Sequence, residues 1–347
     1  MMAKVMIILG SGSDIKIAEK TTSMLEKLQV PYTINVASAH RTHEKVKNLV
    51  EKGTNKGIEV FIAIAGLTAH LGGIIASYTH KPVIGVPVKA KLGGIDAIFA
   101  NAQMPYPAPV ATVGIDRGDN GAILAAQIIA VNDYNIKKNI SKLREEYKIK
   151  VDKDDDEIQN KIKGSFLVEN FMDKEDNDES ETSLSNNYKN DITTTNKEYG
   201  DALVSVVPGS YSDMKIAKKV TNVLDRLKIP YDLNIISPIR NPDKFEEYIN
   251  SQENVKVFIA VSGLSAHVAG AIVALSEKPV IGVPCSIELN GLDSLISMTS
   301  MPPGVPVATV GISNGKNGGI LAGEILAILD KNIESNLKLL KYESNDI

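Results

Sequence analysis

The sequence repeats itself at a distance of almost two hundred residues, and this duplication limits the possible folds more than any other feature. Four segments of the first part return in the same order: GSGSDIKIA (10–18) as GSYSDMKIA (209–217), GLTAH (66–70) as GLSAH (263–267), KPVIGVPV (81–88) as KPVIGVPC (278–285), and PVATVGI (109–115) unchanged at 306–312. A period this long indicates a duplicated domain rather than a solenoid. We therefore divide the 347 residues into a first repeat (1–150) and a second repeat (201–347).

The segment between the repeats, residues 151–200, differs from both in composition. It holds 14 acidic and six basic side chains and is rich in Asn, Ser and Thr. Such a segment cannot bury enough apolar surface to offset the entropy lost on ordering. We predict an acidic, flexible linker, within which GSFLVENFM (164–172) is apolar enough to dock on a folded domain.

Each repeat alternates short apolar runs with amphipathic helical patterns. In the first repeat, a helix is predicted over Asp14–Leu28, and a second over Asn120–Val131 that continues to about Lys148. Strands are predicted at Lys4–Leu9, Tyr32–Ala37, Val60–Ala65, Pro82–Pro87 and Val110–Ile115. Alternating strands and helices favour a parallel sheet covered on both faces. We predict an α/β fold: a flavodoxin-like, doubly wound, five-stranded parallel sheet in three αβα layers, present twice in tandem.

Composition narrows the function classes. A formal net charge of −4 argues against a general nucleic-acid-binding protein. Cys285 is the only cysteine, which excludes a disulfide framework. No apolar run approaches the roughly 18 residues of a membrane span, so a cytoplasmic location is expected. No cluster shows metal-ligand spacing, and neither a metal nor another cofactor is expected.

The loops that follow the strands are the places to look for function, because doubly wound sheets bind ligands beyond the carboxyl ends of their strands. The first loop, GSGSD (10–14), is neither a dinucleotide fingerprint nor a Walker loop. Its hydroxyls (Ser11, Ser13) and the carboxylate of Asp14 stand at a helix N-terminus, which suits a phosphate and ribose hydroxyls. Simple helix capping is the alternative.

The second loop, SAHRT (38–42), places a histidine and an arginine side by side. Arg41 offers a permanently charged fork for phosphate, and the imidazole of His40 can give and take a proton near neutral pH. Ser38 opens the same loop. Only five of the 38 basic residues are arginine, and Arg240 holds the matching position in the second repeat. A surface pair that caps the next helix is the alternative.

The third loop, GLTAHLGG (66–73), consists mostly of small residues, which allow a ligand to approach the backbone closely. His70 either contacts substrate or orients the loop, and a purely structural histidine is an equal alternative. Ala69 and Leu71 flank it as candidate binding residues.

These three loops together resemble the PurE family of purine biosynthesis, whose pattern of GSxSD, SAHRT and AHL loops lies on a flavodoxin-like core. The resemblance covers residues 1–150 and again 201–335 and is similar to the tandem duplicated form of the family. Thr68, Gly72 and His43 depart from the usual pattern. The resemblance implies that N5-carboxyaminoimidazole ribonucleotide is converted to 4-carboxy-5-aminoimidazole ribonucleotide without a cofactor. It also implies His40 as the proton shuttle, with Ser11, Asp14 and Arg41 at the ribose phosphate.

The second repeat departs from this pattern at the decisive position. It reads SPIR (237–240), so Ile239 stands where the shuttle histidine is expected. Ser210, Asp213 and Arg240 remain, and we predict a repeat that has lost catalysis and keeps a possible binding cradle. The resemblance also implies a homo-oligomer, in which four tandem chains supply eight domains.

Three other functions stay open at this stage. The first is direct carboxylation of aminoimidazole ribonucleotide with CO2. The second is a related carboxylase that acts on nicotinate-type dinucleotides during nickel-cofactor synthesis. The third is a non-enzymatic nucleotide-binding sensor or scaffold, and the presence of His40 favours an enzyme over it.

Overall fold

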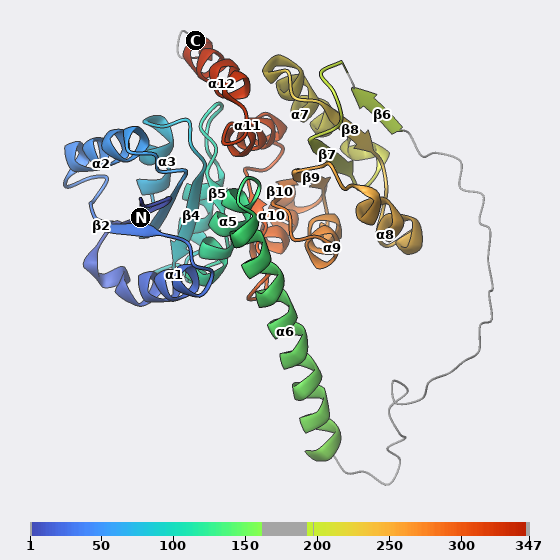
Figure 1. The fold of residues 1–347 in the computed structure, drawn as a ribbon, viewed down its shortest axis with the longest axis horizontal. Helices are drawn as coiled ribbons and strands as arrows, with labels where there is room; N and C mark the ends of the chain where they lie inside the picture. Colours follow the sequence, from blue (N-terminus) through green and yellow to red (C-terminus); the bar gives the residue numbers. More distant parts are fainter. Residues whose placement is uncertain (1, 162–192, 197, 345–347) are drawn as a thin grey trace.

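The computed structural model describes residues 2–161, 193–196 and 198–344 (Figure 1). Its first repeat runs through β1 (Val5–Leu9), α1 (Ile15–Lys27), β2 (Tyr32–Val36), α2 (His43–Asn55), β3 (Val60–Gly66), α3 (Leu71–Ser77), β4 (Val83–Val88), α4 (Ile95–Ala102), β5 (Ala111–Thr112), α5 (Gly118–Ala130) and α6 (Tyr134–Lys161). The second runs through β6 (Thr193–Asn196), β7 (Val204–Pro208), α7 (Met214–Leu227), β8 (Tyr231–Asn234), α8 (Pro242–Ser251), β9 (Val257–Ser262), α9 (His267–Leu275), β10 (Val280–Pro284), α10 (Leu292–Thr299), β11 (Ala308–Thr309), α11 (Gly315–Leu326) and α12 (Lys331–Glu343).

The strand order confirms the predicted fold in both repeats. The first repeat has the order β2-β1-β3-β4-β5 and the second β8-β7-β9-β10-β11, each with parallel pairing, which is the flavodoxin-like order. Helices cover both faces (Figure 1). The central strands are buried along their whole length, as their continuous apolar sequences require.

The two sheets join edge to edge into one sheet, which the prediction of two tandem domains did not include. β5 and β11 pair antiparallel at Thr112 and Thr309, so among the described residues a single eleven-stranded sheet runs through both repeats. β6 adds antiparallel to β8 at the far edge of the second repeat. β5, at Ala111–Thr112, is shorter than the predicted Val110–Ile115.

A pseudo-two-fold relation connects the repeats across this junction. The buried amide of Asn120 donates to the carbonyl oxygen of Pro302 at 2.9 Å, and its own oxygen accepts from the backbone N–H of Gly304 at 2.9 Å. Its counterpart Asn317, 197 residues later in the sequence, donates to the carbonyl oxygen of Met104 at 2.9 Å. The two repeats therefore pack as the halves of a symmetric dimer would.

Helix boundaries differ from the predictions near the end of the first repeat. The single helix expected over Asn120 to about Lys148 is two helices, because the carboxylate of Asp133 accepts from the backbone N–H groups of Asn135 and Ile136 and caps a new helix. α6 then continues to Lys161, eleven residues into the range predicted as linker, and projects beyond the rest of the first repeat (Figure 1). The segment 164–172 lies outside the described residues.

No helix in the described part of the chain is both long and apolar enough to cross a membrane.

Candidate active site

A cavity of about 630 Å³ opens at the carboxyl ends of β1, β2, β3 and β4. The loops after these strands line it, and the structure brings all the candidate residues of the first repeat together there: Ser11, Ser13, Asp14, Ser38, His40, Arg41, Ala69, His70 and Leu71. The parallel sheet explains this convergence, because the carboxyl ends of neighbouring parallel strands lie at one edge.

Two histidines from different loops meet in this cavity. Nε2 of His40 lies 3.0 Å from Nδ1 of His70, and the ring centroids are 5.1 Å apart at an interplanar angle of 71°. At this distance one nitrogen must donate and the other accept, so at least one ring is neutral. Both side chains are exposed, and His40 can therefore exchange a proton with a molecule in the cavity.

The first loop forms a cluster of hydroxyl groups around a buried carboxylate. Ser11 accepts from the backbone N–H of Ser13 at 3.3 Å, and the Ser13 hydroxyl lies 3.0 Å from that of Ser11 and 3.2 Å from Oδ1 of Asp14. Burial raises the pKa of the Asp14 carboxyl, and hydrogen bonds from Ser13 and Ser11 oppose part of that shift. The loop thus offers polar groups at a helix start, where an anion or a ribose hydroxyl is stabilised.

Arg41 connects the first and second loops. Its guanidinium donates to the carbonyl oxygen of Gly10 and to the hydroxyl of Ser38, each at 3.4 Å. These long hydrogen bonds orient the fork, while the side chain stays exposed. The remaining N–H groups can bind a phosphate in bidentate fashion.

The third loop adopts an unusual backbone conformation. Leu67 and Ala69 both have positive φ angles, of 55° and 37°. Such left-handed conformations cost about 1–3 kcal/mol for residues other than glycine. The second repeat keeps them at Leu264 (57°) and Ala266 (50°). The loop holds buried Ala69 against the cavity and presents His70 immediately before α3.

A fourth loop that sequence analysis missed also lines the cavity. Val88 ends β4, Lys89 and Ala90 follow it, and the backbone N–H of Lys89 donates to a carboxylate oxygen of Asp116 at 2.9 Å. The shared segment KPVIGVPV ends here, so its position at the same sheet edge was the available signal. Lys89 brings a second cationic side chain to the cavity.

The second repeat keeps the cradle but not the histidine pair. Ser210 donates to the carboxylate of Asp213 at 3.0 Å, and Arg240 donates to the carbonyl oxygen of Gly209 at 2.6 Å. Ile239, with 68% of its surface exposed, occupies the position of the shuttle histidine. The ring of His267 contacts the Ser265 hydroxyl at 2.7 Å instead of a second imidazole.

The fourth loop of the second repeat also changes the shape of that cradle. A Cβ placed on Gly263 would lie only 2.6 Å from Cδ1 of Ile287, so the isoleucine side chain covers this strand end. In the first repeat the corresponding residue is Ala90, whose Cβ would lie 3.6 Å from a Cβ placed on Gly66. The two sites therefore differ both in the histidine pair and in the side chain beside this strand end.

Among the described residues, no three His, Cys, Asp or Glu side chains lie close enough to hold a metal ion.

Comparison with known proteins decides the family. The family model described as AIR carboxylase matches residues 4–150 and again residues 203–346. The chain belongs to the AIR carboxylase family. This result confirms both the resemblance to PurE proteins and the tandem duplication.

Members of the AIR carboxylase family with one or two repeats are similar to this chain. A probable N5-carboxyaminoimidazole ribonucleotide mutase of Methanothermobacter thermautotrophicus is 55% identical over 344 residues, 99% of each chain. The N5-carboxyaminoimidazole ribonucleotide mutase of Methanocaldococcus jannaschii is 53% identical over 157 residues, 45% of this chain and 98% of that protein. A solved PurE structure from Treponema denticola is 29% identical, covers 44% of this chain and 97% of its own, and has a TM-score of 0.42.

Proposed function

We propose that the first repeat converts N5-carboxyaminoimidazole ribonucleotide to 4-carboxy-5-aminoimidazole ribonucleotide, a step of purine biosynthesis. The observation that carries the proposal is the contact between His40 and His70 inside a cavity that also contains an anion cradle. The name of the relative from Methanothermobacter thermautotrophicus, which matches this chain over almost its whole length, supports the same reaction.

The reaction moves one carboxylate and returns His40 to its starting state. Protonated His40 donates its proton to N5 as the bond between N5 and the carboxylate carbon breaks, which releases CO2 and leaves the aminoimidazole. C4 of the ring then attacks CO2 and forms the new carbon–carbon bond. Neutral His40 removes the C4 proton, which restores the aromatic ring, and the protons and electrons balance without a further reactant.

His70 acts in this proposal as a positioning residue and a candidate proton partner. Its Nδ1 holds one nitrogen of His40, which fixes the orientation of the imidazole toward the substrate. Nδ1 of His70 can accept a hydrogen bond from Nε2 of His40 when that nitrogen is protonated, and it can donate one when that nitrogen is not. His70 can therefore stabilise both protonation states of His40.

The remaining loops bind the ribose phosphate and retain CO2. Arg41 and the hydroxyls of Ser11 and Ser13 face the phosphate, and Asp14 accepts from ribose hydroxyls. Ala69 and Leu71 are both buried and form an apolar wall, beside which CO2 is held until C4 attacks it. An apolar wall limits hydration and escape of CO2 between the two half-reactions.

The second repeat, in this proposal, binds nucleotide without transforming it. Its cradle of Ser210, Asp213 and Arg240 keeps the hydrogen bond from the arginine to the loop glycine, whereas Ile239 cannot carry a proton. Binding there would stabilise the second repeat and, through the shared sheet, the junction with the first.

We also infer a cytoplasmic protein that assembles from four tandem chains into a particle with eight domains. The pseudo-two-fold packing of the repeats supports this inference, because one chain already reproduces the dimer from which a symmetric particle is built.

Direct carboxylation of aminoimidazole ribonucleotide is the second candidate function. The family description, AIR carboxylase, names this activity, and the geometry of the site would serve it equally well. The two reactions share the attack of C4 on CO2 and differ in where that CO2 originates.

A carbon-isotope experiment separates the two candidates. The substrate carries 13C in its N5 carboxylate, and unlabelled bicarbonate is present in excess. The proposal expects 13C in the C4 carboxylate of the product, since CO2 stays in the cavity between the half-reactions. Products that contain only unlabelled carbon would contradict the mutase and support the carboxylase.

A further inference from the structure

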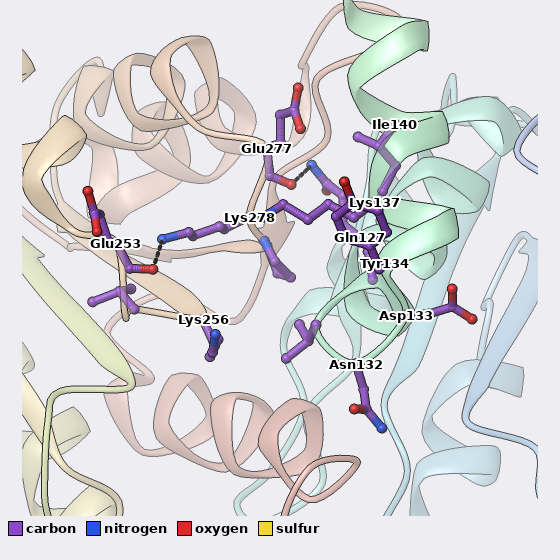
Figure 2. Close-up of a pocket in the computed structure, with 14 residues that line it drawn as sticks. Gln127, Asn132, Asp133, Tyr134, Lys137, Ile140, Glu253, Lys256, Glu277 and Lys278 are labelled. Atoms are coloured by element: carbon purple, nitrogen blue, oxygen red, sulfur yellow. Dashed lines mark hydrogen bonds between the residues drawn. The ribbon is translucent and has the colours of Figure 1, made fainter.

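A second cavity, of about 330 Å³, lies between the repeats at the end of the sheet opposite to the candidate active site. Residues from the end of α5, the start of α6 and the segments before β9 and β10 line it (Figure 2). Its volume falls in the range of small-molecule pockets.

Three lysines reach this cavity from separate elements. Lys137 comes from α6, Lys256 immediately precedes β9, and Lys278 lies two residues before β10. The ammonium group of Lys278 donates to the carbonyl oxygens of Gln252 and Glu253, at 2.5 and 3.1 Å. Carbonyl oxygens hold the ammonium group without neutralising its charge.

The acidic residues of the lining direct their carboxylates elsewhere. Asp133 pairs with Lys4 at 3.0 Å, and Glu277 accepts from the hydroxyl of Ser141 at 2.6 Å. In Figure 2 the carboxylates of Asp133, Glu253 and Glu277 all point away from the three lysines. Burial, followed by the like charges of Lys256 and Lys137, lowers the pKa of Lys278 to about 8, and Glu253 opposes only part of the shift.

The pseudo-symmetric position on the other side of the junction holds a carboxylate that this group of lysines lacks. There Lys137 is replaced by Glu334 and Lys278 by Lys81, each 197 residues away in the sequence. The Glu334 carboxylate lies 2.7 Å from Nε2 of His80, 3.0 Å from Nζ of Lys338 and 3.8 Å from Nζ of Lys81. At the counterpart position the Glu334 carboxylate therefore lies among cationic side chains. In the cavity of Figure 2 the equivalent residue is Lys137, which adds a positive charge instead.

A buried amide lies at the wall of the cavity. The side chain of Gln127 is 97% buried and donates through Nε2 to the carbonyl oxygen of Glu277 at 3.0 Å. This bond fixes the amide orientation and leaves Oε1 without a partner in the structure. A buried acceptor without a partner costs about 1–3 kcal/mol.

We propose that this junction cavity binds a small oxyanion with a phosphate or carboxylate group, held by Lys137, Lys256 and Lys278. The anion takes the place that the Glu334 carboxylate holds across the junction. Because both repeats supply lysines, the bound anion stabilises their contact.

The test uses the full chain with both nucleotide cradles disabled by Arg41→Gln and Arg240→Gln, so that phosphate cannot report on them. Calorimetric titration with inorganic phosphate, and in a second arm with malonate, is compared with chloride at equal ionic strength. Lys137→Glu places a carboxylate where Glu334 stands in the counterpart. Lys138→Glu is the matched control, because it makes the same charge change on a neighbouring exposed residue that does not line the cavity.

The proposal expects saturable binding of phosphate or malonate beyond any effect of chloride. Lys137→Glu should weaken that binding by about tenfold or more and should raise the midpoint of thermal unfolding without added anion. Lys138→Glu should change the affinity by no more than about twofold. The proposal would be overturned if neither phosphate nor malonate showed saturable binding. Equal losses of affinity in Lys137→Glu and Lys138→Glu would overturn it as well.

Discussion

His40 and His70 lie on different loops and are joined by a 3.0 Å contact between their ring nitrogens. Thirty residues separate them in the sequence, and only the parallel order of β2, β1 and β3 brings them together. The second repeat shows the contrast, because His267 contacts a serine and Ile239 takes the other position. The contact between two histidines is therefore present in the first repeat and absent from the equivalent loops of the second.

Replacement of His40 by asparagine should remove catalysis and leave the fold intact. Asparagine has similar size but cannot transfer a proton, and a positioned acid–base group contributes about a hundredfold to ten-thousandfold in rate. We expect kcat to fall by that factor while the thermal midpoint stays unchanged, because His40 is exposed. Ile239→Asn, at the same position of the second repeat, is the control and should keep full activity. A similar loss in both variants would contradict the assignment.

Ala69→Val should damage the active site through the backbone. Ala69 has a φ of 37° and is buried, and a β-branched residue is strongly disfavoured in that conformation. We expect kcat/KM to fall by about tenfold or more, as the loop shifts and the CO2-retaining wall opens. Ala266→Val makes the same change at a φ of 50° in the second repeat. It should lower stability to a similar degree and keep kcat/KM, and a matching loss of activity would count against the role of the first-repeat loop.

Asn120→Ala should destabilise the junction between the repeats. Asn120 donates to the carbonyl oxygen of Pro302 and accepts from the N–H of Gly304, both inside the junction. Truncation leaves these buried groups unpaired, and we expect a loss of about 1–3 kcal/mol in the free energy of unfolding. Chemical denaturation measures the loss, and exposed Asn254→Ala provides a control. Equal stability of the two variants would show that the junction does not limit unfolding.

Glu324 should make stability depend on pH. It is fully buried beside Lys341, and burial raises its pKa from 4.5 to about 7. A raised carboxyl pKa means that the folded state binds the proton more tightly, so this stabilising contribution is complete below pH 4.5 and is lost as the pH rises to about 7. Glu324→Gln, which copies Gln127 of the first repeat, should flatten that part of the profile of unfolding free energy against pH. An identical profile in the variant would contradict the raised pKa.

The sequence predicted three of the loops that line the cavity because of their place in the fold. The segments that begin at Gly10, Ser38 and Gly66 lie at the carboxyl ends of three parallel strands, and parallel topology alone brings such loops to one edge. Lys89 was missed because it follows its strand without a motif of its own. The direct contact between the two histidines depends on side-chain positions that periodicity does not encode.

The joining of the two sheets was also beyond prediction. It rests on a pair of two-residue strands around Thr112 and Thr309, which are too short to give a pattern. A weak signal was present, since Asn120 and Asn317 occupy equivalent positions in two mostly apolar helices. A buried polar residue retained in both repeats indicates a contact that needs it, and here the contact is the junction.

Steady-state kinetics with two carbon sources test the central claim most directly. The purified chain receives N5-carboxyaminoimidazole ribonucleotide at low bicarbonate, and separately aminoimidazole ribonucleotide with bicarbonate, beside the His40→Asn variant. The account predicts turnover of the N5-carboxylated substrate alone, abolished in the variant. Efficient turnover with bicarbonate, or full activity of His40→Asn, would contradict it.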